Sequence, residues 1–284
     1  VYFVAMNLGY LVLNALSMAS LWRGQQERVL DDLPQVYSGL DPAISLLVPA
    51  YNEEASIADS IRSMLQLNYA NVEIVVINDG SKDGTLAVLQ REFALEPFPQ
   101  AVHERLTTQP VRAYYRSRLH PTLRVIDKDN GGKADSLNAG INLARNELFC
   151  GVDADSILER NSLQKVVKPF LRDPRVVASG GTVRVANGCD IEGGFLTRIN
   201  LPRNLWALFQ VVEYLRAFLF GRLGWSQLNA MLIISGAFGL FRKDVVIEVG
   251  GYKPKTIGED MELVVRLHRH LRAQGRDYRI EFVP

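Results

Sequence analysis

The stretch "ISLLVPAYNEEASIADSIRSMLQLNYANVEIVVIND" (44–79) determines the expected fold. It contains two short apolar runs, 44–50 and 72–79, each with the length of a buried strand. Between them, apolar residues recur at helical spacing: Ile57, Ile61, Met64 and Leu65. A strand, a helix and a second strand in this order predict a parallel βαβ unit.

Later segments repeat this alternation. Two further strands are expected at 122–127 and 147–153, separated by a helix that starts near Lys133. A core-facing helix is expected next, on the helical spacing of Leu163, Val166, Val167, Phe170 and Leu171. Residues 95–121 are rich in Pro and Arg without clear periodicity, which predicts an insertion or a long surface loop. The predicted fold class is α/β, with a mostly parallel central sheet flanked by helices.

The composition narrows the class of protein. The 284 residues are 48% hydrophobic and 22% charged, enough for one large domain or two small ones. A formal net charge of +1 without a long basic block gives no reason to expect a nucleic-acid partner. Cys150 and Cys189 lack C-x-x-C spacing, so neither a disulfide framework nor a zinc site is indicated, and a reducing compartment fits.

Residues 1–22 carry no charge and predict a transmembrane helix, because at ~1.5 Å per residue they reach about 33 Å. A buried core helix and a signal peptide are the alternatives, although no basic residues precede the apolar run. Arg23 and Arg28 follow at once, so the rest of the chain is expected in the cytoplasm, at the inner or plasma membrane. Residues 23–42 form a polar connector. Without an initiating Met, and ending on "EFVP", the sequence is expected to be part of a longer protein.

Residues 204–233 form a second strongly apolar segment. Glu213, Arg216 and Arg222 interrupt it, which makes it too charged to span a membrane comfortably. The segment predicts helices that lie in the membrane interface or cover the active site. An ordinary core helix remains an alternative, since periodicity does not separate the two.

Acidic side chains follow the predicted strands. Glu53 comes after the first strand and Asp79 ends the second, while Asp153 and Asp155 follow the strand at 147–153. In a parallel sheet these groups converge on the carboxyl edge, where ligands bind. Helix capping and dipole compensation are the structural alternatives for each acid taken singly. Two carboxylates at i and i+2 of a strand would face one side, which indicates Mg²⁺ or Mn²⁺ shared with a phosphate-bearing ligand.

Two more segments carry candidate chemistry. The glycine-rich turn and helix "DKDNGGKADSLNAG" (127–140) predict backbone N–H groups and the Lys133 cation facing phosphate, although the segment is not a P-loop. Glu259 and Asp260 begin an amphipathic helix, where they could act as a general base or compensate the helix dipole. His268 and His270 are two residues apart on that helix, so a solvated or interfacial face is expected rather than zinc.

In this order, "PAYNEE", "INDGSKDGT", "NGGKADSLNAG", "DAD", "SGAFGLFRK" and "GED" resemble the motifs of family 2 glycosyltransferases with the GT-A fold. Within that family the sequence is similar to the processive membrane synthases of cellulose, hyaluronan, chitin and poly-N-acetylglucosamine. The resemblance covers residues 43–284 as one domain. It implies inverting transfer from a nucleotide sugar, usually a UDP-sugar, with Mg²⁺ or Mn²⁺, onto a polysaccharide or lipid acceptor.

The resemblance also implies roles for single residues. Nucleotide and donor contacts fall on Ala50, Tyr51, Glu53, Asp79, Lys133 and Asp153. Asp155, beside Asp153, would hold the metal, and Asp260, beside Glu259, would deprotonate the acceptor. Ser235 and Gly236 match the acceptor-side platform, where cellulose synthases carry Cys-Gly.

Several alternatives stay open. The Q-x-x-R-W motif of processive members, which normally lies downstream, is absent from this sequence. A non-processive transferase acting on a lipid acceptor would share the same donor site. A sugar nucleotidyltransferase and a non-catalytic nucleotide-sugar-binding module are less favoured, and any export or accessory subunits are unidentified.

Overall fold

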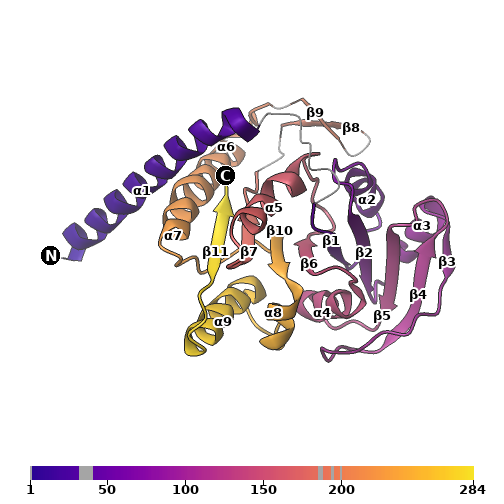
Figure 1. The fold of residues 1–284 in the computed structure, drawn as a ribbon. Coiled ribbons are helices and arrows are strands. Elements are labelled where there is room, and N and C mark those ends of the chain that lie inside the picture. Colours follow the sequence, from indigo (N-terminus) through magenta and orange to yellow (C-terminus); the bar gives the residue numbers. More distant parts are fainter. Residues whose placement is uncertain (1, 32–40, 185–187, 193–194, 199) are drawn as a thin grey trace.

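The computed structural model describes residues 2–31, 41–184, 188–192, 195–198 and 200–284. Within these residues a nine-stranded sheet forms in the order β11-β7-β10-β6-β1-β2-β5-β4-β3, and β8 pairs with β9 separately (Figure 1). The strands are β1 (Ile44–Ala50), β2 (Val72–Asp79), β3 (Leu95–Pro97), β4 (Val111–Ser117), β5 (Leu123–Lys128), β6 (Leu148–Val152), β7 (Val176–Gly181), β8 (Asp190–Glu192), β9 (Phe195–Arg198), β10 (Phe238–Arg242) and β11 (Arg279–Val283). The helices are α1 (Tyr2–Asp31), α2 (Ile57–Leu65), α3 (Thr85–Glu92), α4 (Lys133–Leu143), α5 (Ser162–Arg172), α6 (Leu205–Leu215), the π-helix η1 (Arg216–Arg222), α7 (Leu223–Gln227), α8 (Lys243–Glu248) and α9 (Glu259–Ala273).

The centre of the sheet is parallel, and the predicted α/β class is confirmed. β1 pairs in parallel with both β2 and β6, and β2 pairs in parallel with β5. The βαβ unit predicted over 44–79 is β1, α2 and β2, and the strands expected at 122–127 and 147–153 are β5 and β6. Each parallel connection carries a helix because two parallel strands need a long crossover.

The flanks of the sheet are mixed. β10 lies antiparallel between β6 and β7. On the other flank β4 pairs antiparallel with β5, and β3 pairs antiparallel with β4. The expectation of a loop throughout 95–121 is therefore wrong for β3 and β4. Charged side chains conceal the alternation of β4, where the Arg116 guanidinium pairs with Glu96 and lies 4.5 Å from the ring centroid of Phe98. Such charges suit a strand near the edge of a sheet.

Alternate side chains of β1 enter two cores, one on each face of the sheet. Leu47 packs in the core formed with α4 and α9, whereas Leu46 and Val48 pack in the core formed with α2, α3 and α5. The helix predicted around Leu163 is α5, and Leu163, Val166 and Val167 are buried as expected. Leu171, at the end of the predicted stripe, is instead exposed.

Helix α1 projects from this body and lies beside η1 and α7 (Figure 1). Tyr2–Trp22 is long and apolar enough to cross a membrane, and about a tenth of its most apolar window is buried, unlike a core helix. Gly224 of α7 allows the close packing, since a Cβ there would lie 2.8 Å from the Leu13 carbonyl oxygen. The helix continues to Asp31, into the expected connector 23–42, of which 32–40 lie outside the described residues.

The segment 204–233 divides into two environments. No residue of α6 is buried, and Trp206 and Phe209 are exposed on it. In α7, by contrast, Leu223 belongs to the core. The core alternative therefore fits α7, whereas α6 lies outside the core.

His268 on α9 is buried, so the solvated face expected for it is wrong. Its Nδ1 lies 2.5 Å from the Tyr278 hydroxyl and its Nε2 lies 2.7 Å from the Met231 carbonyl oxygen. Arg272 Nε donates to the same hydroxyl at 3.0 Å. Tyr278 lies directly before β11, outside the helix that carries His268, so helical spacing alone does not predict this partner.

His268 is expected to make stability depend on pH. Burial lowers the pKa of its imidazole below the ordinary value, and the nearby Arg272 cation lowers it further. The unfolded chain then binds the proton more readily, so this contribution to stability is present above about pH 6.5 and is lost as the pH falls below it. Urea unfolding between pH 7.5 and about 5 measures this effect: the free energy of unfolding should fall less steeply with falling pH in His268→Gln than in the unchanged chain. Replacing the exposed His103 by Gln should leave this pH dependence unchanged.

Candidate functional site

The carboxyl edge of the parallel strands gathers the predicted site residues. The chain passes from β1 to β2 on one side and returns to β6 on the other, so β1 and β6 flank a topological switch point. Ala50 ends β1 and is buried, while Tyr51 after it is exposed. Asp153 directly follows β6. This edge is where ligands of open α/β sheets bind.

The loops after β1 and β2 are joined by hydrogen bonds. Glu54 accepts a bond from the Gly84 N–H at 3.0 Å, and the Glu53 N–H donates to Thr85 Oγ1 at 2.9 Å. The Glu53 carboxylate accepts the Ser56 hydroxyl at 2.6 Å. These hydrogen bonds hold the two loops together next to Tyr51.

Asp79, at the end of β2, is buried and holds the glycine-rich turn. Its carboxylate accepts the N–H of Gly131 at 3.0 Å, the N–H of Gly132 at 2.7 Å and the side-chain amide of Asn130 at 3.1 Å. The expectation that the turn's N–H groups face phosphate is wrong for these two glycines, because both donate inward to Asp79. Lys133 is then the group of this segment that faces the site.

Lys133 is the first residue of α4 and lies between two carboxylates. Its Nζ pairs with Asp153 and lies 3.9 Å from Glu259 Oε1. All three side chains are partly exposed, so a ligand can reach them. The structure thereby brings together the start of α4, the turn after β6 and the start of α9.

Asp153 and Asp155 lie in a turn rather than on a strand. β6 ends at Val152, and the Ser156 N–H donates to the Asp153 carbonyl at 3.0 Å. Strand alternation is therefore not what orients the two acids; the burial of Ala154 between them anchors the turn.

Asp155 offers a free carboxylate at this turn. It is exposed, and no hydrogen bond or ion pair joins it to another described residue. The described part of the chain contains no cluster of three or more His, Cys, Asp or Glu side chains suited to a metal. Protein sites often hold Mg²⁺ by one or two carboxylates plus substrate phosphates. The carboxylates of Asp153 and Asp155 suit a cation held in that way.

Gly236 lies between Lys133 and Asp260. Its N–H donates to Asp260 Oδ2 at 3.3 Å, and a Cβ at this position would lie 3.0 Å from Lys133 Nζ. Ser235 forms the turn before β10, with its carbonyl accepting the Phe238 N–H at 3.1 Å. The absence of a side chain at Gly236 leaves the lysine and the aspartate close together.

The surroundings of Asp260 include two groups that motifs did not indicate. Burial raises the pKa of the Tyr252 phenol, and the negative charges of Asp260 and Glu259 raise it further. Burial lowers the pKa of the Arg222 guanidinium, while the Asp260 charge opposes that change. The sequence feature that indicates Arg222 is its charge inside the otherwise apolar segment 204–233.

The sequence matches the family model "Glycosyl transferase family 2" over residues 45–250. The poly-beta-1,6-N-acetyl-D-glucosamine synthase of Staphylococcus aureus (strain COL) is 30% identical over 244 residues, covering 85% of this chain and 48% of that protein. The Staphylococcus epidermidis protein of that name is 28% identical over the same shares of both chains. The chain thus spans about half the length of the curated relatives it matches.

Two solved structures share the fold. The mannosyltransferase PcManGT from Pyrobaculum calidifontis, in complex with GDP-Man and Mn²⁺, has a TM-score of 0.60 at 20% identity over 96% of this chain and 66% of that chain. Staphylococcus aureus TarS 1–349 in complex with UDP-GlcNAc has a TM-score of 0.52 at 15% identity over 85% of this chain and 56% of that chain. At these identities the similarity shows the fold alone.

Proposed function

Because the chain belongs to glycosyl transferase family 2, we propose that it transfers a sugar from a UDP-sugar to a growing polysaccharide, with inversion, at the cytoplasmic face of a membrane. The observation that carries this proposal is that Lys133 contacts Asp153 and Glu259 and lies beside Gly236, whose N–H donates to Asp260. This grouping supports the proposal because a cation suited to a diphosphate lies near a carboxylate suited to accept a proton.

In this proposal Asp260 takes the proton from the acceptor hydroxyl, which then attacks the anomeric carbon. Lys133 offsets the charge that develops on the departing diphosphate, and Ala50, Tyr51, Glu53, Asp79 and Asp153 form the donor side. Asp155, with Asp153, would hold Mg²⁺ or Mn²⁺, which when bound would neutralise diphosphate charge. A single displacement inverts the anomeric centre. Ser235 and Gly236 lie on the acceptor side.

The similar proteins guide the choice of substrates. The Staphylococcus aureus relative is named for a polymer of N-acetylglucosamine, and the TarS structure holds UDP-GlcNAc. We therefore expect UDP-GlcNAc to be the most active donor when membranes containing the chain are incubated with a panel of UDP-sugars and GDP-mannose. Nucleotide release with none of these donors would contradict the proposed function. Product attached to lipid rather than to polymer would favour the non-processive alternative.

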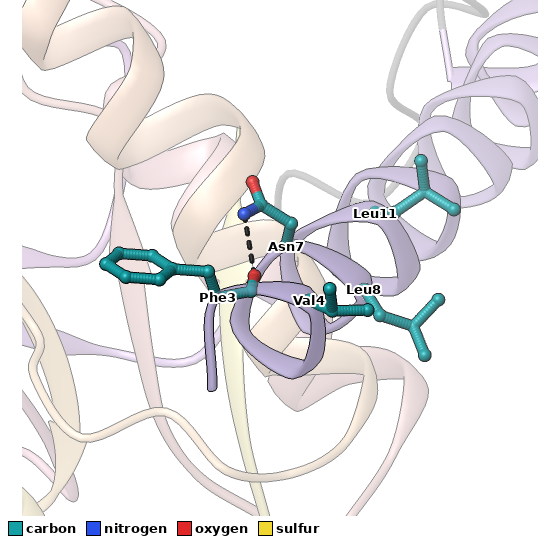
Figure 2. A pocket seen from close by; sticks show the side chains of 5 residues that line it. All are labelled: Phe3, Val4, Asn7, Leu8 and Leu11. Carbon is teal, nitrogen blue, oxygen red and sulfur yellow. Dashed lines mark hydrogen bonds between the residues drawn. The ribbon is translucent and has the colours of Figure 1, made fainter. Parts of the chain in front are cut away.

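We propose that α1 and α6 face lipid. A hollow of about 410 Å³ on α1, seen in Figure 2, is lined by Phe3, Val4, Asn7, Leu8 and Leu11. Asn7 Nδ2 donates to the Phe3 carbonyl at 2.7 Å, so this amide is satisfied within the helix, as a lipid environment favours. The hollow lies on the projecting helix, away from the candidate site, and its apolar lining matches a lipid-facing surface.

Tryptophan fluorescence can test this placement. The three tryptophans of the sequence, Trp22, Trp206 and Trp225, are all exposed and lie on α1, α6 and α7. Tryptophan favours the membrane interface, so vesicles of brominated lipid should quench the emission of the reconstituted chain. Trp206→Phe should lower the fraction of emission that is quenched if α6 contacts lipid. Emission that is unchanged by brominated lipid would contradict the proposed placement.

A further inference from the structure

A fully buried lysine lies beneath the glycine-rich turn. Lys128 ends β5 with its side chain 0% exposed, and its Nζ lies 2.7 Å from Asp79 Oδ1 and 2.6 Å from Asp135 Oδ2. The same Nζ donates to the Asp129 carbonyl at 2.6 Å. One cation thus serves two buried carboxylates, whose remaining charge must be offset by other donors.

Those other donors belong to the chain around the turn. Asp79 accepts the N–H groups of Gly131 and Gly132, as described above. Asp135 accepts the Gln109 N–H at 3.0 Å and lies against Gly131, where a Cβ would come within 2.4 Å of Asp135 Oδ2. The cluster of Lys128, Asp79 and Asp135 therefore fixes both the direction and the packing of the turn.

The turn leads directly into Lys133. Gly132 has a φ of +86°, a conformation that favours glycine, and the next residue begins α4 with no side-chain cap. The direction in which Lys133 leaves the turn is thus set by the two residues that Asp79 holds. Loss of the buried cation would leave two buried carboxylates without their shared counter-ion, which is strongly unfavourable in the interior.

We propose that Lys128 is a positioning residue: through Asp79 and Asp135 it orients the turn so that Lys133 reaches the donor diphosphate beside Asp153. This inference rests on the proposed function. Lys128 itself is enclosed and touches no ligand. Its effect on the donor should therefore depend on Lys133 being present.

The test replaces Lys128 by Met in the full chain in detergent, with Arg124→Met as the matched control. Arg124 is a buried cation on the same strand β5, but it pairs with Glu73 near the opposite end of β2. Hydrogen exchange at the Gly131 and Gly132 amides measures the turn, and calorimetry with UDP in Mn²⁺ buffer measures donor affinity. Both readouts are repeated for Lys128→Met with Lys133 replaced by Ala.

We expect exchange at the two glycines to rise at least tenfold, equivalent to ~1.4 kcal/mol, in Lys128→Met and not in Arg124→Met. UDP affinity should fall by about tenfold, and only when Lys133 is present. This is the lower end of the loss seen in metal sites when a residue that orients a metal ligand is replaced. Unchanged exchange, or an equal loss of affinity in the Lys133→Ala background, would overturn the proposal.

The design also covers a variant that does not fold and a chain that does not bind UDP. If Lys128→Met fails to fold, Asp135→Asn removes one arm of the cluster while Lys128 keeps Asp79, and faster exchange at Gly131 is again required. If the unchanged chain binds no UDP, the proposed function is wrong, and the glycine exchange still decides whether Lys128 holds the turn.

Discussion

Replacing Asp260 by Asn is expected to lower kcat by about 10²- to 10⁴-fold, the usual contribution of a general base, while leaving the affinity for UDP unchanged. An amide keeps the shape of the side chain and can still accept the Met261 N–H, which Asp260 Oδ1 accepts at 2.8 Å. It cannot take the acceptor proton. Nucleotide release with the most active donor measures the first quantity, and calorimetry with UDP measures the second.

Asp244 provides a matched control for the alternative that Asp260 compensates a helix dipole. It is the second residue of α8, as Asp260 is of α9, and its Oδ1 accepts the next N–H at the same 2.8 Å. Asp244→Asn should therefore leave kcat unchanged. Equal turnover of the two variants would assign Asp260 the dipole role. Glu259→Gln should have the smaller effect of the two neighbouring acids, since Glu259 faces Lys133 at 3.9 Å.

The parallel centre of the sheet was predictable because its strands are continuous apolar runs, as expected when both faces are buried. The same rule indicated the candidate site, since residues far apart in sequence meet where parallel strands end. By this rule the sequence alone groups Lys133 with Asp153, which lies 20 residues further along the chain.

The remaining features depend on contacts that periodicity does not encode. Lys128 follows an apolar strand and lies between two aspartates, a pattern that suggests a solvated turn, yet it is enclosed because Asp79 and Asp135 approach from β2 and α4. His268 is buried for the same kind of reason, since Tyr278 reaches it from outside its helix. The inward direction of the glycine N–H groups also follows from Asp79. In each case the partner comes from another element, and a single sequence does not show it.

Asp155 is the residue proposed to hold the metal. Replacing it by Ala should abolish the dependence of UDP binding on Mn²⁺, lowering affinity in Mn²⁺ buffer by at least about 100-fold. This loss of affinity exceeds the ~10- to 100-fold that is typical when a residue orienting a metal ligand is replaced, because here a direct ligand would be lost. Its carboxylate has no described partner, so the change should cost little stability, and thermal unfolding without nucleotide checks this.

Glu159→Gln is the control for a general loss of negative charge near the turn. Glu159 is exposed, lies four residues further along and pairs with Lys165 at 2.8 Å. Its replacement should leave the Mn²⁺ dependence intact, because a charge this exposed is largely screened by salt. If Asp155→Ala still binds UDP more tightly with Mn²⁺ than without it, Asp153 or the nucleotide itself must hold the metal. The free carboxylate of Asp155 would then have a different role.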